Sequence, residues 1–460
     1  MESTALLPDV RRVHFIGIGG SGMCSLAEIL HAMGYEVTGS DDNESDNVTR
    51  LRALGIPVYL PLGADNIGNP EAVIYTVAVN ESHPEMQAAR ALGVPVIERA
   101  ALLGLLTRHT PRSLAVSGTH GKTTTTSMIA QILMQAELDP TLVIGGRLPL
   151  IDANGRAGKS DILVCEACEF KDHYLEMAPA FSVILNVDAD HLEYFGSLDN
   201  IIRSFHRFSE LTTKTLLVNG NDANTMRAVE GIEGKPIIRF GTTPDCDWYA
   251  ANIAPGGPYG RYDLYHGGAF VTHIRLSVPG HHNIANSVAA AAAASLRGAA
   301  PEQIAAGLES FGGAGRRFEK IGTAGGVTIV DDYAHHPTEI AATLEAAKSL
   351  PHRLVWAVFQ PFTFSRTARH LDGFAEALSA ADVAVVSDIM GSREVNTWNV
   401  SSSQITDRLP GSHYIPDFEG ISRFVADNAA DGDLVVTMGG GDIYKCARLI
   451  RKKLEEKAAT

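Results

Sequence analysis

The strongest constraint on the fold is a short glycine loop between a strand-like and a helix-like segment. The loop reads Gly118-Thr-His-Gly-Lys-Thr-Thr124 and follows the apolar run Leu114–Val116. A strand that passes through a glycine turn into a helix is typical of α/β domains with parallel sheets. Apolar residues behind the loop recur at helical spacing and predict a helix that begins near Thr123: Met128, Ile129, Ile132 and Leu133.

The same loop predicts phosphate binding. Backbone N–H groups and the positive end of the helix face an anion there, and Lys122 adds a full charge. The hydroxyl of Thr123 stands where a Mg²⁺ ligand is needed. The general P-loop pattern has a glycine five residues before Gly121, where this chain has Val116, so the loop is a shorter variant. A tight turn with a surface lysine is the alternative interpretation.

A second glycine loop lies near the beginning of the chain. Gly17, Gly19 and Gly22 form a Gly-x-Gly-x-x-Gly pattern between a strand at Val13–Ile16 and a helix predicted from about Met23 to Met33. This pattern predicts a diphosphate at the helix N-terminus. A glycine turn that only packs a helix on a sheet is the alternative.

The strand after that helix, Glu36–Thr38, ends at Gly39-Ser40-Asp41. We expect Ser40 or Asp41 to contact a ribose. The motif alone does not separate NAD from another nucleotide diphosphate. The triphosphate-type loop about 100 residues later makes a dehydrogenase the poorer choice.

The chain is expected to hold three α/β domains. A length of 460 residues suits about three domains of ~150 residues. The third block opens after Gly312-Gly-Ala-Gly315, which resembles a flexible hinge. We place the domains at residues 1–107, 108–315 and 316–460. Strands that alternate with helical segments predict a parallel sheet in the last domain: Val327–Val330, Leu354–Phe359, Val383–Val386 and Leu434–Met438.

Composition excludes several classes of protein. A formal net charge of −15 argues against a nucleic-acid groove. No signal peptide and no apolar stretch of membrane-spanning length is visible, so a cytoplasmic protein is expected. Five cysteines do not form a disulfide framework. Cys165 and Cys168 form a lone CxxC, which we interpret as structural thiols rather than a metal or redox site.

Polar residues in the central block follow predicted strands. Glu166 comes after Ile162–Val164, and His191 follows Phe181–Leu185. Carboxyl ends of parallel strands share one edge of a sheet, so Thr123, Glu166 and His191 are expected to converge there. A hydroxyl, a carboxylate and an imidazole beside phosphates suit a Mg²⁺ environment.

Two further polar clusters stand at element boundaries. The run Pro279–Asn286 includes Asn283 and Asn286 and precedes an alanine-rich helix. Two roles are open for these amide side chains: they cap the helix, or they contact a nucleobase. The run Val330–Glu339 ends a strand and begins a helix at Pro337, a favoured first helical position. Its acids, tyrosine and histidines exceed what a cap requires, so we expect substrate or nucleotide contacts there.

Together these motifs resemble the Mur ligase family, from Val13 to about Tyr444. The markers are, in chain order, Gly17–Met23, Gly39–Asp41, Gly118–Thr124, Glu166–Glu169, Asn186–His191, His282–Asn286, Gly315–Phe318, Asp331–Pro337, Phe359–Pro361 and Arg366. Cys168 replaces an aspartate, and Phe362-Thr363 replaces His-Arg, of the Gram-negative members. Both changes resemble the shorter, Gram-positive type.

The resemblance implies a role for each matching residue. The expected architecture is α/β: a Rossmann-like N-terminal domain, a P-loop ATPase-like central domain and a Rossmann-like C-terminal domain. ATP binding would involve Gly118, Thr119, His120, Gly121, Lys122, Thr123, Thr124, Asn283, Asn286, Arg317 and Asp332. Mg²⁺ would be held by Thr123, Glu166 and His191, and catalysis would depend on Lys122, Glu166 and His191. The UDP sugar would meet Gly17, Gly19, Gly22, Ser40 and Asp41, whereas Tyr333, His335 and Arg366 would orient the amino acid or carboxylate.

The resemblance also implies the substrates. The expected reaction joins the carboxylate of UDP-N-acetylmuramate to L-alanine through an acyl phosphate. Neither nucleic acid nor a membrane is expected as a partner. The expected assembly is a monomer or a weak homodimer. A recycling member that attaches a whole tripeptide is the nearest alternative. An NAD-dependent dehydrogenase and a catalytically silent nucleotide-binding regulator are alternatives of other classes. His191 has two possible roles, metal ligation and acceptance of the amine proton.

Overall fold

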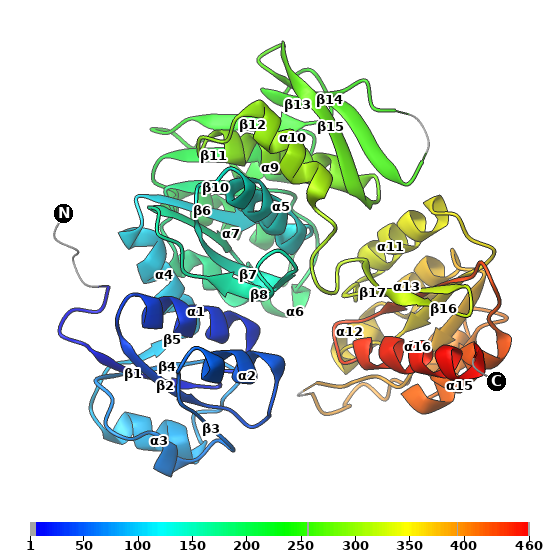
Figure 1. Cartoon of the computed structure of the whole chain (residues 1–460), viewed down its shortest axis with the longest axis horizontal. Helices are drawn as coiled ribbons and strands as arrows, with labels where there is room; N and C mark the ends of the chain where they lie inside the picture. The colour runs from blue at the N-terminus through cyan, green and yellow to red at the C-terminus, as the bar shows by residue number, and fades with distance from the viewer. Residues whose placement is uncertain (1–5, 255–256, 393, 459–460) are drawn as a thin grey trace. The chain divides into compact units, whose positions relative to one another are not determined.

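The protein contains three sheets flanked by helices, as predicted (Figure 1). The computed structural model describes residues 6–254, 257–392 and 394–458. The chain divides into two compact units. The first runs to Asn252 and includes Tyr262–Ile274 and Ala285–Phe311, whereas the second takes the remainder, chiefly the chain from Gly312 onward. No helix in the described ranges has the length and apolar character needed to span a membrane.

The first sheet is fully parallel, with the order β3-β2-β1-β4-β5. Side chains of β1 and β4 alternate between two apolar layers, so α1 and α2 cover one face and α3 covers the other (Figure 1). Its elements are β1 Arg12–Ile16, α1 Ser21–Ala32, β2 Glu36–Ser40, α2 Asp46–Ala53, β3 Val58–Tyr59, η1 Ala64–Asn66, β4 Ala72–Tyr75, α3 Pro84–Ala91 and β5 Val96–Glu98. The helix predicted from Met23 begins two residues earlier, at Ser21.

The second sheet has the order β15-β14-β13-β12-β11-β10-β6-β9-β7-β8. Strand β6 lies between β9 and β10 and is parallel to both, so the glycine loop after β6 stands at the centre of the sheet. Its elements are α4 Arg99–His109, β6 Arg112–Ser117, α5 Lys122–Gln135, β7 Thr141–Leu148, β8 Ala153–Arg156, β9 Ile162–Glu166, η2 Phe170–Glu176, β10 Phe181–Ile184, α6 Leu192–Phe195, α7 Leu198–Leu211, β11 Thr215–Asn219, α8 Ala223–Ala228, β12 Ile237–Gly241, β13 Trp248–Ala251, β14 Tyr259–His266, β15 Ala269–Pro279, α9 His282–Ser295 and α10 Pro301–Ser310.

The alanine-rich helix differs from the prediction at its beginning. We expected the run Pro279–Asn286 to precede the helix, but α9 already begins at His282. Asn283 and Asn286 therefore lie in its first two turns. They are thus residues of the helix rather than of a segment in front of it.

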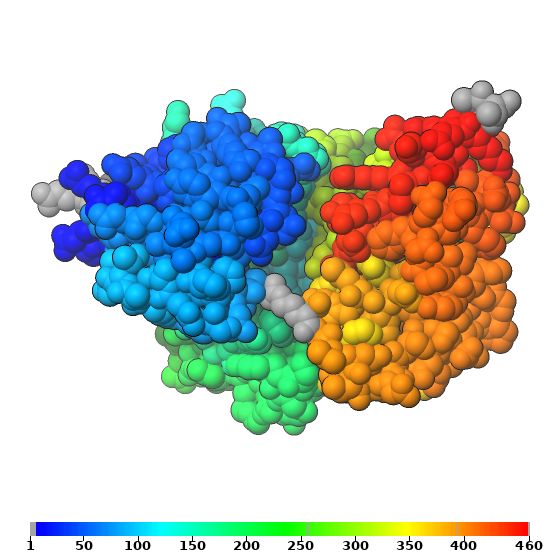
Figure 2. Space-filling model, turned by 90° about the horizontal axis from the view of Figure 1, so that it is seen from below, coloured from blue at the N-terminus to red at the C-terminus, as the bar shows by residue number. Residues whose placement is uncertain are grey.

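The third sheet has the order β16-β17-β21-β18-β19-β20 and is parallel except for the β16–β17 pair. Alternate residues of its central strands enter two apolar cores, one under α11 and α13 and one under α15 and α16. Helix α16, in the red segment of Figure 2, lies at the surface of this unit. The elements are β16 Glu319–Ala324, β17 Val327–Asp332, α11 Pro337–Ser349, β18 Val355–Phe359, α12 Phe364–Arg369, α13 Leu371–Leu378, β19 Val383–Val386, α14 Ser403–Thr406, β20 His413–Tyr414, α15 Phe418–Asn428, β21 Leu434–Met438 and α16 Tyr444–Ala458.

Candidate active site

The central glycine loop brings its backbone close to the segment after β10 and to helix α9. Gly118 and Gly121 have φ of 137° and 83°, in the region that favours glycine. A Cβ on Gly118 would lie 2.9 Å from the Cβ of Leu185, and one on Gly121 would lie 2.8 Å from Oδ1 of Asn286. The loop thus presents backbone rather than side chains at the N-terminus of α5, which is the geometry that admits phosphate.

Asn186, the second residue after β10, holds this loop in shape. Its Oδ1 accepts a hydrogen bond of 2.8 Å from the backbone N–H of His120, and its Nδ2 donates one of 3.0 Å to the carbonyl of His120. Its own carbonyl accepts the N–H of Thr119 at 3.0 Å. The His120 ring lies 3.4 Å from the Asp188 carboxylate. The segment that follows β10, a neighbour of β6, therefore holds the loop in shape.

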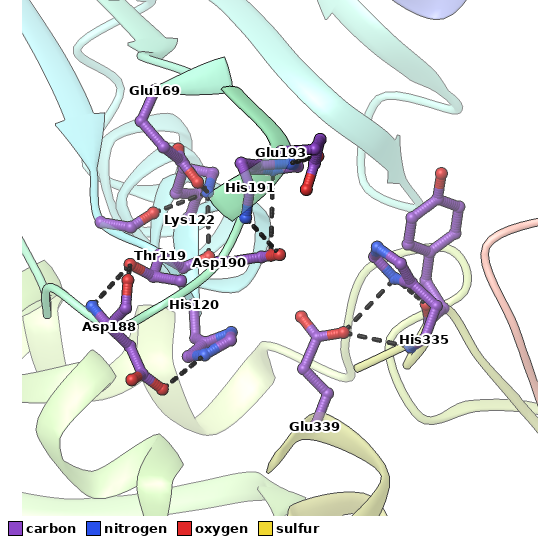
Figure 3. A network of polar contacts seen from close by, with 12 residues as sticks. Thr119, His120, Lys122, Glu169, Asp188, Asp190, His191, Glu193, His335 and Glu339 are labelled. Atoms are coloured by element: carbon purple, nitrogen blue, oxygen red, sulfur yellow. Dashed lines mark hydrogen bonds and ion pairs between the residues drawn. The ribbon is translucent and has the colours of Figure 1, made fainter. Parts of the chain in front are cut away.

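Lys122 is partly buried and forms an ion pair with the buried Glu169. Its Nζ lies 2.9 Å from Oε2 of Glu169, which is only 3% exposed, and donates to the carbonyls of Gly118 and Thr119 (Figure 3). Burial acts to lower the pKa of Lys122, but the charge of Glu169, joined by Cys168 and Glu166, raises it above the ordinary value overall. The lysine is therefore held protonated at the phosphate loop.

Thr123 and Glu166 meet beside the loop. The Thr123 hydroxyl donates to Oε2 of Glu166 at 3.1 Å, and the backbone N–H of Gly145 donates to Oε1. Within the described ranges no group of three or more His, Cys, Asp and Glu side chains is arranged to hold a metal ion. A hydroxyl and one carboxylate nevertheless suit Mg²⁺, which commonly completes its octahedral shell with phosphate oxygens and water.

His191 is not joined to that pair by a hydrogen bond or an ion pair. The residue has φ of 53° and precedes α6. Its Nδ1 lies 3.3 Å from Glu193 and its Nε2 lies 3.8 Å from Asp190 (Figure 3). Its ring centre lies 4.6 Å from that of Phe170. The predicted convergence of His191 on Thr123 and Glu166 is therefore not supported by a direct contact between these side chains.

The N-terminal glycine loop is built by the two residues expected to contact ribose. Gly19 donates its N–H to Oδ2 of Asp41 at 2.8 Å, and the N–H groups of Gly17 and Ile18 donate to the carbonyl of Ser40. The buried Ser40 hydroxyl donates to Oε1 of Glu85 at 2.5 Å. The structure thus brings the predicted diphosphate loop and Ser40-Asp41 together at one edge of the first sheet.

The predicted C-terminal residues gather at the end of β17. Asp332 is buried and accepts backbone N–H groups from Phe318 and Ala334 at 2.7 and 2.8 Å. The Arg317 guanidinium lies 5.2 Å from the centre of the Tyr333 ring, and Nδ1 of His335 lies 2.9 Å from the Tyr333 carbonyl. Glu339 pairs with the His335 ring at 3.3 Å (Figure 3). This cluster combines a guanidinium, a carboxylate, a phenol and an imidazole.

The two other predicted contacts lie on helices. Arg366 is in the first turn of α12, where Thr363 caps the helix by accepting the N–H of Arg366 at 3.4 Å. Asn283 donates through Nδ2 to the carbonyl of Pro279 at 2.7 Å. The expected contacts of Arg366 and Asn283 with ligands stay predictions.

Several functional candidates carry no signal of their own in the sequence. Glu169 stands out only as part of the Glu166–Glu169 run, and Asp188 and Glu339 are simply acids between or at the start of predicted elements. The contacts of Glu169 with Lys122 and of Asp188 with His120 depend on which strands are neighbours. Glu339 instead contacts His335 from four residues further along the chain. Spacing from the end of a strand is the only signal that points to them.

Burial of Asp332 predicts a pH-dependent contribution to stability. Burial raises its pKa to about 6, against the opposing charge of Arg317 and the two backbone N–H groups. The unfolded chain ionises this carboxyl near ~4, so the folded protein binds more protons between pH ~4 and ~6, and stability falls as pH rises through that range. Asp332→Asn should remove this term. Urea unfolding measured from pH 4 to 7 should therefore show that the unfolding free energy of the wild type decreases by up to ~3 kcal/mol more than that of the variant. Parallel pH profiles would contradict the prediction.

Comparison with known proteins decides the family. Mur ligase family models match three successive segments: the catalytic domain at 12–110, the middle domain at 116–294 and the glutamate ligase domain at 316–441. A UDP-N-acetylmuramate–L-alanine ligase of Caldanaerobacter subterraneus subsp. tengcongensis is 44% identical over 457 residues, 98% of each chain. This chain belongs to the Mur ligase family. The resemblance inferred from the motifs is confirmed, and the chain is an ATP-using ligase.

Other Mur ligases resemble the chain over nearly its whole length. A ligase of the same name from Agathobacter rectalis is 44% identical over 96% of this chain and 98% of its own. The crystal structure of UDP-N-acetylmuramate-alanine ligase from Thermotoga maritima superposes with a TM-score of 0.82 at 28% identity, covering 98% of this chain and all of that one. A murein peptide ligase from Psychrobacter arcticus, with a TM-score of 0.74 over 96% of this chain and 98% of that one, is 24% identical and shares the fold.

Proposed function

We propose that this Mur ligase joins L-alanine to the lactyl carboxylate of UDP-N-acetylmuramate, with ATP converted to ADP and phosphate. Relatives bearing that activity in their names, at 44% identity over nearly the full length of both chains, carry the proposal. The geometry supports it, because the central loop offers a cradle for a triphosphate and the N-terminal loop offers a separate cradle for a diphosphate.

The central residues have distinct roles in activating the carboxylate. Lys122 lies at the loop, where its charge would stabilise the transferring γ-phosphoryl group. Thr123 and Glu166 would hold Mg²⁺, which when bound neutralises charge on the phosphates. The substrate carboxylate then attacks phosphorus, ADP leaves and an acyl phosphate forms. The amine of L-alanine attacks the acyl carbon, and phosphate leaves.

Glu169 acts as the resting partner of Lys122. The Lys122 charge is balanced by this carboxylate, which is 3% exposed. A phosphate that enters the loop offers the ammonium a second anion at the same place. We infer that Glu169 keeps Lys122 protonated and aimed at the loop before ATP arrives.

His191 is the candidate for proton transfer or for a metal contact. Its ring lies beside the carboxylates of Asp190 and Glu193. That environment suits acceptance of a proton from the attacking amine. A metal contact remains the second role, through rotation of the ring.

Each of the three expected domains would bind a different substrate or supply different contacts. Residues 1–107 would hold the UDP sugar, residues 108–315 ATP, and residues 316–460 would supply Arg317, Asp332, Tyr333, His335 and Arg366 to the nucleotide and the amino acid. Gly312–Gly315 would act as the hinge, since an acyl phosphate survives only where water is excluded. We expect a monomer or weak homodimer, which analytical ultracentrifugation checks.

Phosphate release should require all four reaction components. We expect turnover with ATP, Mg²⁺, UDP-N-acetylmuramate and L-alanine together, and only background release when any one is left out. Glycine and L-serine, tested separately, measure selectivity. Equal release without L-alanine would contradict the ligase proposal and indicate an ATPase.

The alternatives give different results in the same assay. A recycling ligase would use L-alanyl-γ-D-glutamyl-meso-diaminopimelate far better than L-alanine, a substrate named for the Neisseria meningitides protein that shares this fold. A dehydrogenase-like N-terminal loop would bind NADH, which a fluorescence titration detects. We expect no NADH binding and a clear preference for L-alanine.

A further inference from the structure

Arg99 stands at a position that the motifs did not single out. It is the first residue of α4 and follows directly on β5, which lies in the same parallel sheet as β1. The carboxyl ends of β1 and β5 therefore face the same edge, where the Gly17–Gly22 loop begins. Arg99 is thus placed at the edge that the proposed function gives to the UDP sugar.

The side chain of Arg99 lies against the first turn of α1. A Cβ on Gly22 would come within 3.2 Å of both Cδ and Nη1 of Arg99. Only a residue without a side chain allows this approach. The contact therefore places a guanidinium directly beside the last glycine of the Gly-x-Gly-x-x-Gly pattern.

The other side of Arg99 faces the central site. Arg99 lines a small cavity of about 20 Å³ together with Glu166, Cys168 and His173. Arg99 therefore lies against the N-terminal glycine loop on one side and shares a cavity with Glu166 of the central site on the other.

The guanidinium has no anion of its own. Within the described ranges the Arg99 side chain makes no hydrogen bond or ion pair, and the adjacent Glu98 pairs instead with His173 at 3.5 Å. The first turn of α1 also contains no acidic residue. A partly buried guanidinium without a counter-ion, beside an uncharged glycine turn, suits an anionic group of a ligand.

We propose that Arg99 binds the diphosphate of the UDP sugar and so positions the muramyl carboxylate for attack on ATP. The inference rests on the proposed function. The diphosphate is favoured over the lactyl carboxylate because the guanidinium touches Gly22, whereas its approach to Glu166 is only through the shared cavity. Its planar fork suits two phosphate oxygens at once.

Calorimetry with three ligands tests this assignment. UDP-N-acetylglucosamine has the diphosphate but lacks the lactyl carboxylate, UDP-N-acetylmuramate has both, and ATP reports on the central loop. In Arg99→Ala both UDP sugars should bind roughly 10- to 100-fold more weakly, the range for hydrogen bonds to charged groups, with ATP affinity unchanged. Arg99→Lys should bind the UDP sugars with intermediate affinity, because the charge remains but the fork is lost.

Arg108→Ala provides a matched control. Arg108 is an exposed arginine of the same helix that donates to the Glu176 carbonyl, so its removal should leave all three affinities unchanged. A loss confined to UDP-N-acetylmuramate would overturn the diphosphate assignment in favour of the carboxylate. Unchanged UDP-sugar binding in a folded Arg99→Ala protein would overturn any ligand role for Arg99. Failure of the wild type to bind UDP-N-acetylmuramate would instead count against the proposed function.

Discussion

Lys122→Ala is expected to lower the rate of phosphate release by ~10³-fold, equivalent to ~4 kcal/mol of transition-state stabilisation. The ammonium donates to the carbonyls of Gly118 and Thr119, so it is held inside the loop where charge develops during phosphoryl transfer. Steady-state phosphate release with saturating substrates measures the effect. Lys159→Ala, which removes an exposed lysine from the same unit, should retain full activity.

The same substitution leaves a buried charge without its partner. Glu169 is 3% exposed, and loss of the Lys122 ammonium is expected to destabilise the fold by several kcal/mol. The double variant Lys122→Ala/Glu169→Gln removes both charges and should recover most of that stability in urea unfolding. Activity should not recover with it. If activity returned together with stability, Lys122 would be structural, and its catalytic assignment would be wrong.

Gly19→Val should weaken binding of UDP-N-acetylmuramate by at least ~100-fold, equivalent to ~3 kcal/mol. A Cβ on Gly19 would lie 2.9 Å from Oδ2 of Asp41 and 3.0 Å from Cγ2 of Val48. The carboxylate that accepts the Gly19 N–H would have to move, and a branched side chain would also occupy the space in which backbone meets diphosphate. Calorimetric titration with the UDP sugar measures the loss.

Titration with ATP serves as the internal control for this variant. ATP is assigned to the loop at Lys122, so its affinity should change little. Ala53→Val adds similar bulk at an exposed position of α2 and should leave UDP-sugar binding intact. Weakened ATP binding with intact UDP-sugar binding would reverse the assignment of the two nucleotide sites.

Local sequence was sufficient for the elements that carry the two loops. A strand, a glycine turn and a helix are encoded within about twenty consecutive residues around Gly118 and again around Gly19, because periodicity and conformational freedom act over short range. The strands Val383–Val386 and Leu434–Met438 were predicted to the residue, since continuous β-branched and apolar runs suit a strand buried on both faces. The order of the motifs was then specific enough to indicate the family.

Tertiary structure alone decided which side chains meet. Glu169 faces Lys122 and Asn186 clamps His120 because β9 and β10 flank β6, an order that no local pattern contains. Arg99 reaches Gly22 for a similar reason: two segments 77 positions apart end at one sheet edge. Strand order depends on how several apolar faces are buried at once, which is a property of the whole chain. The sequence by itself therefore determined the two loops, the α/β class and the family, whereas the partners of Lys122 and the position of Arg99 were decided by packing.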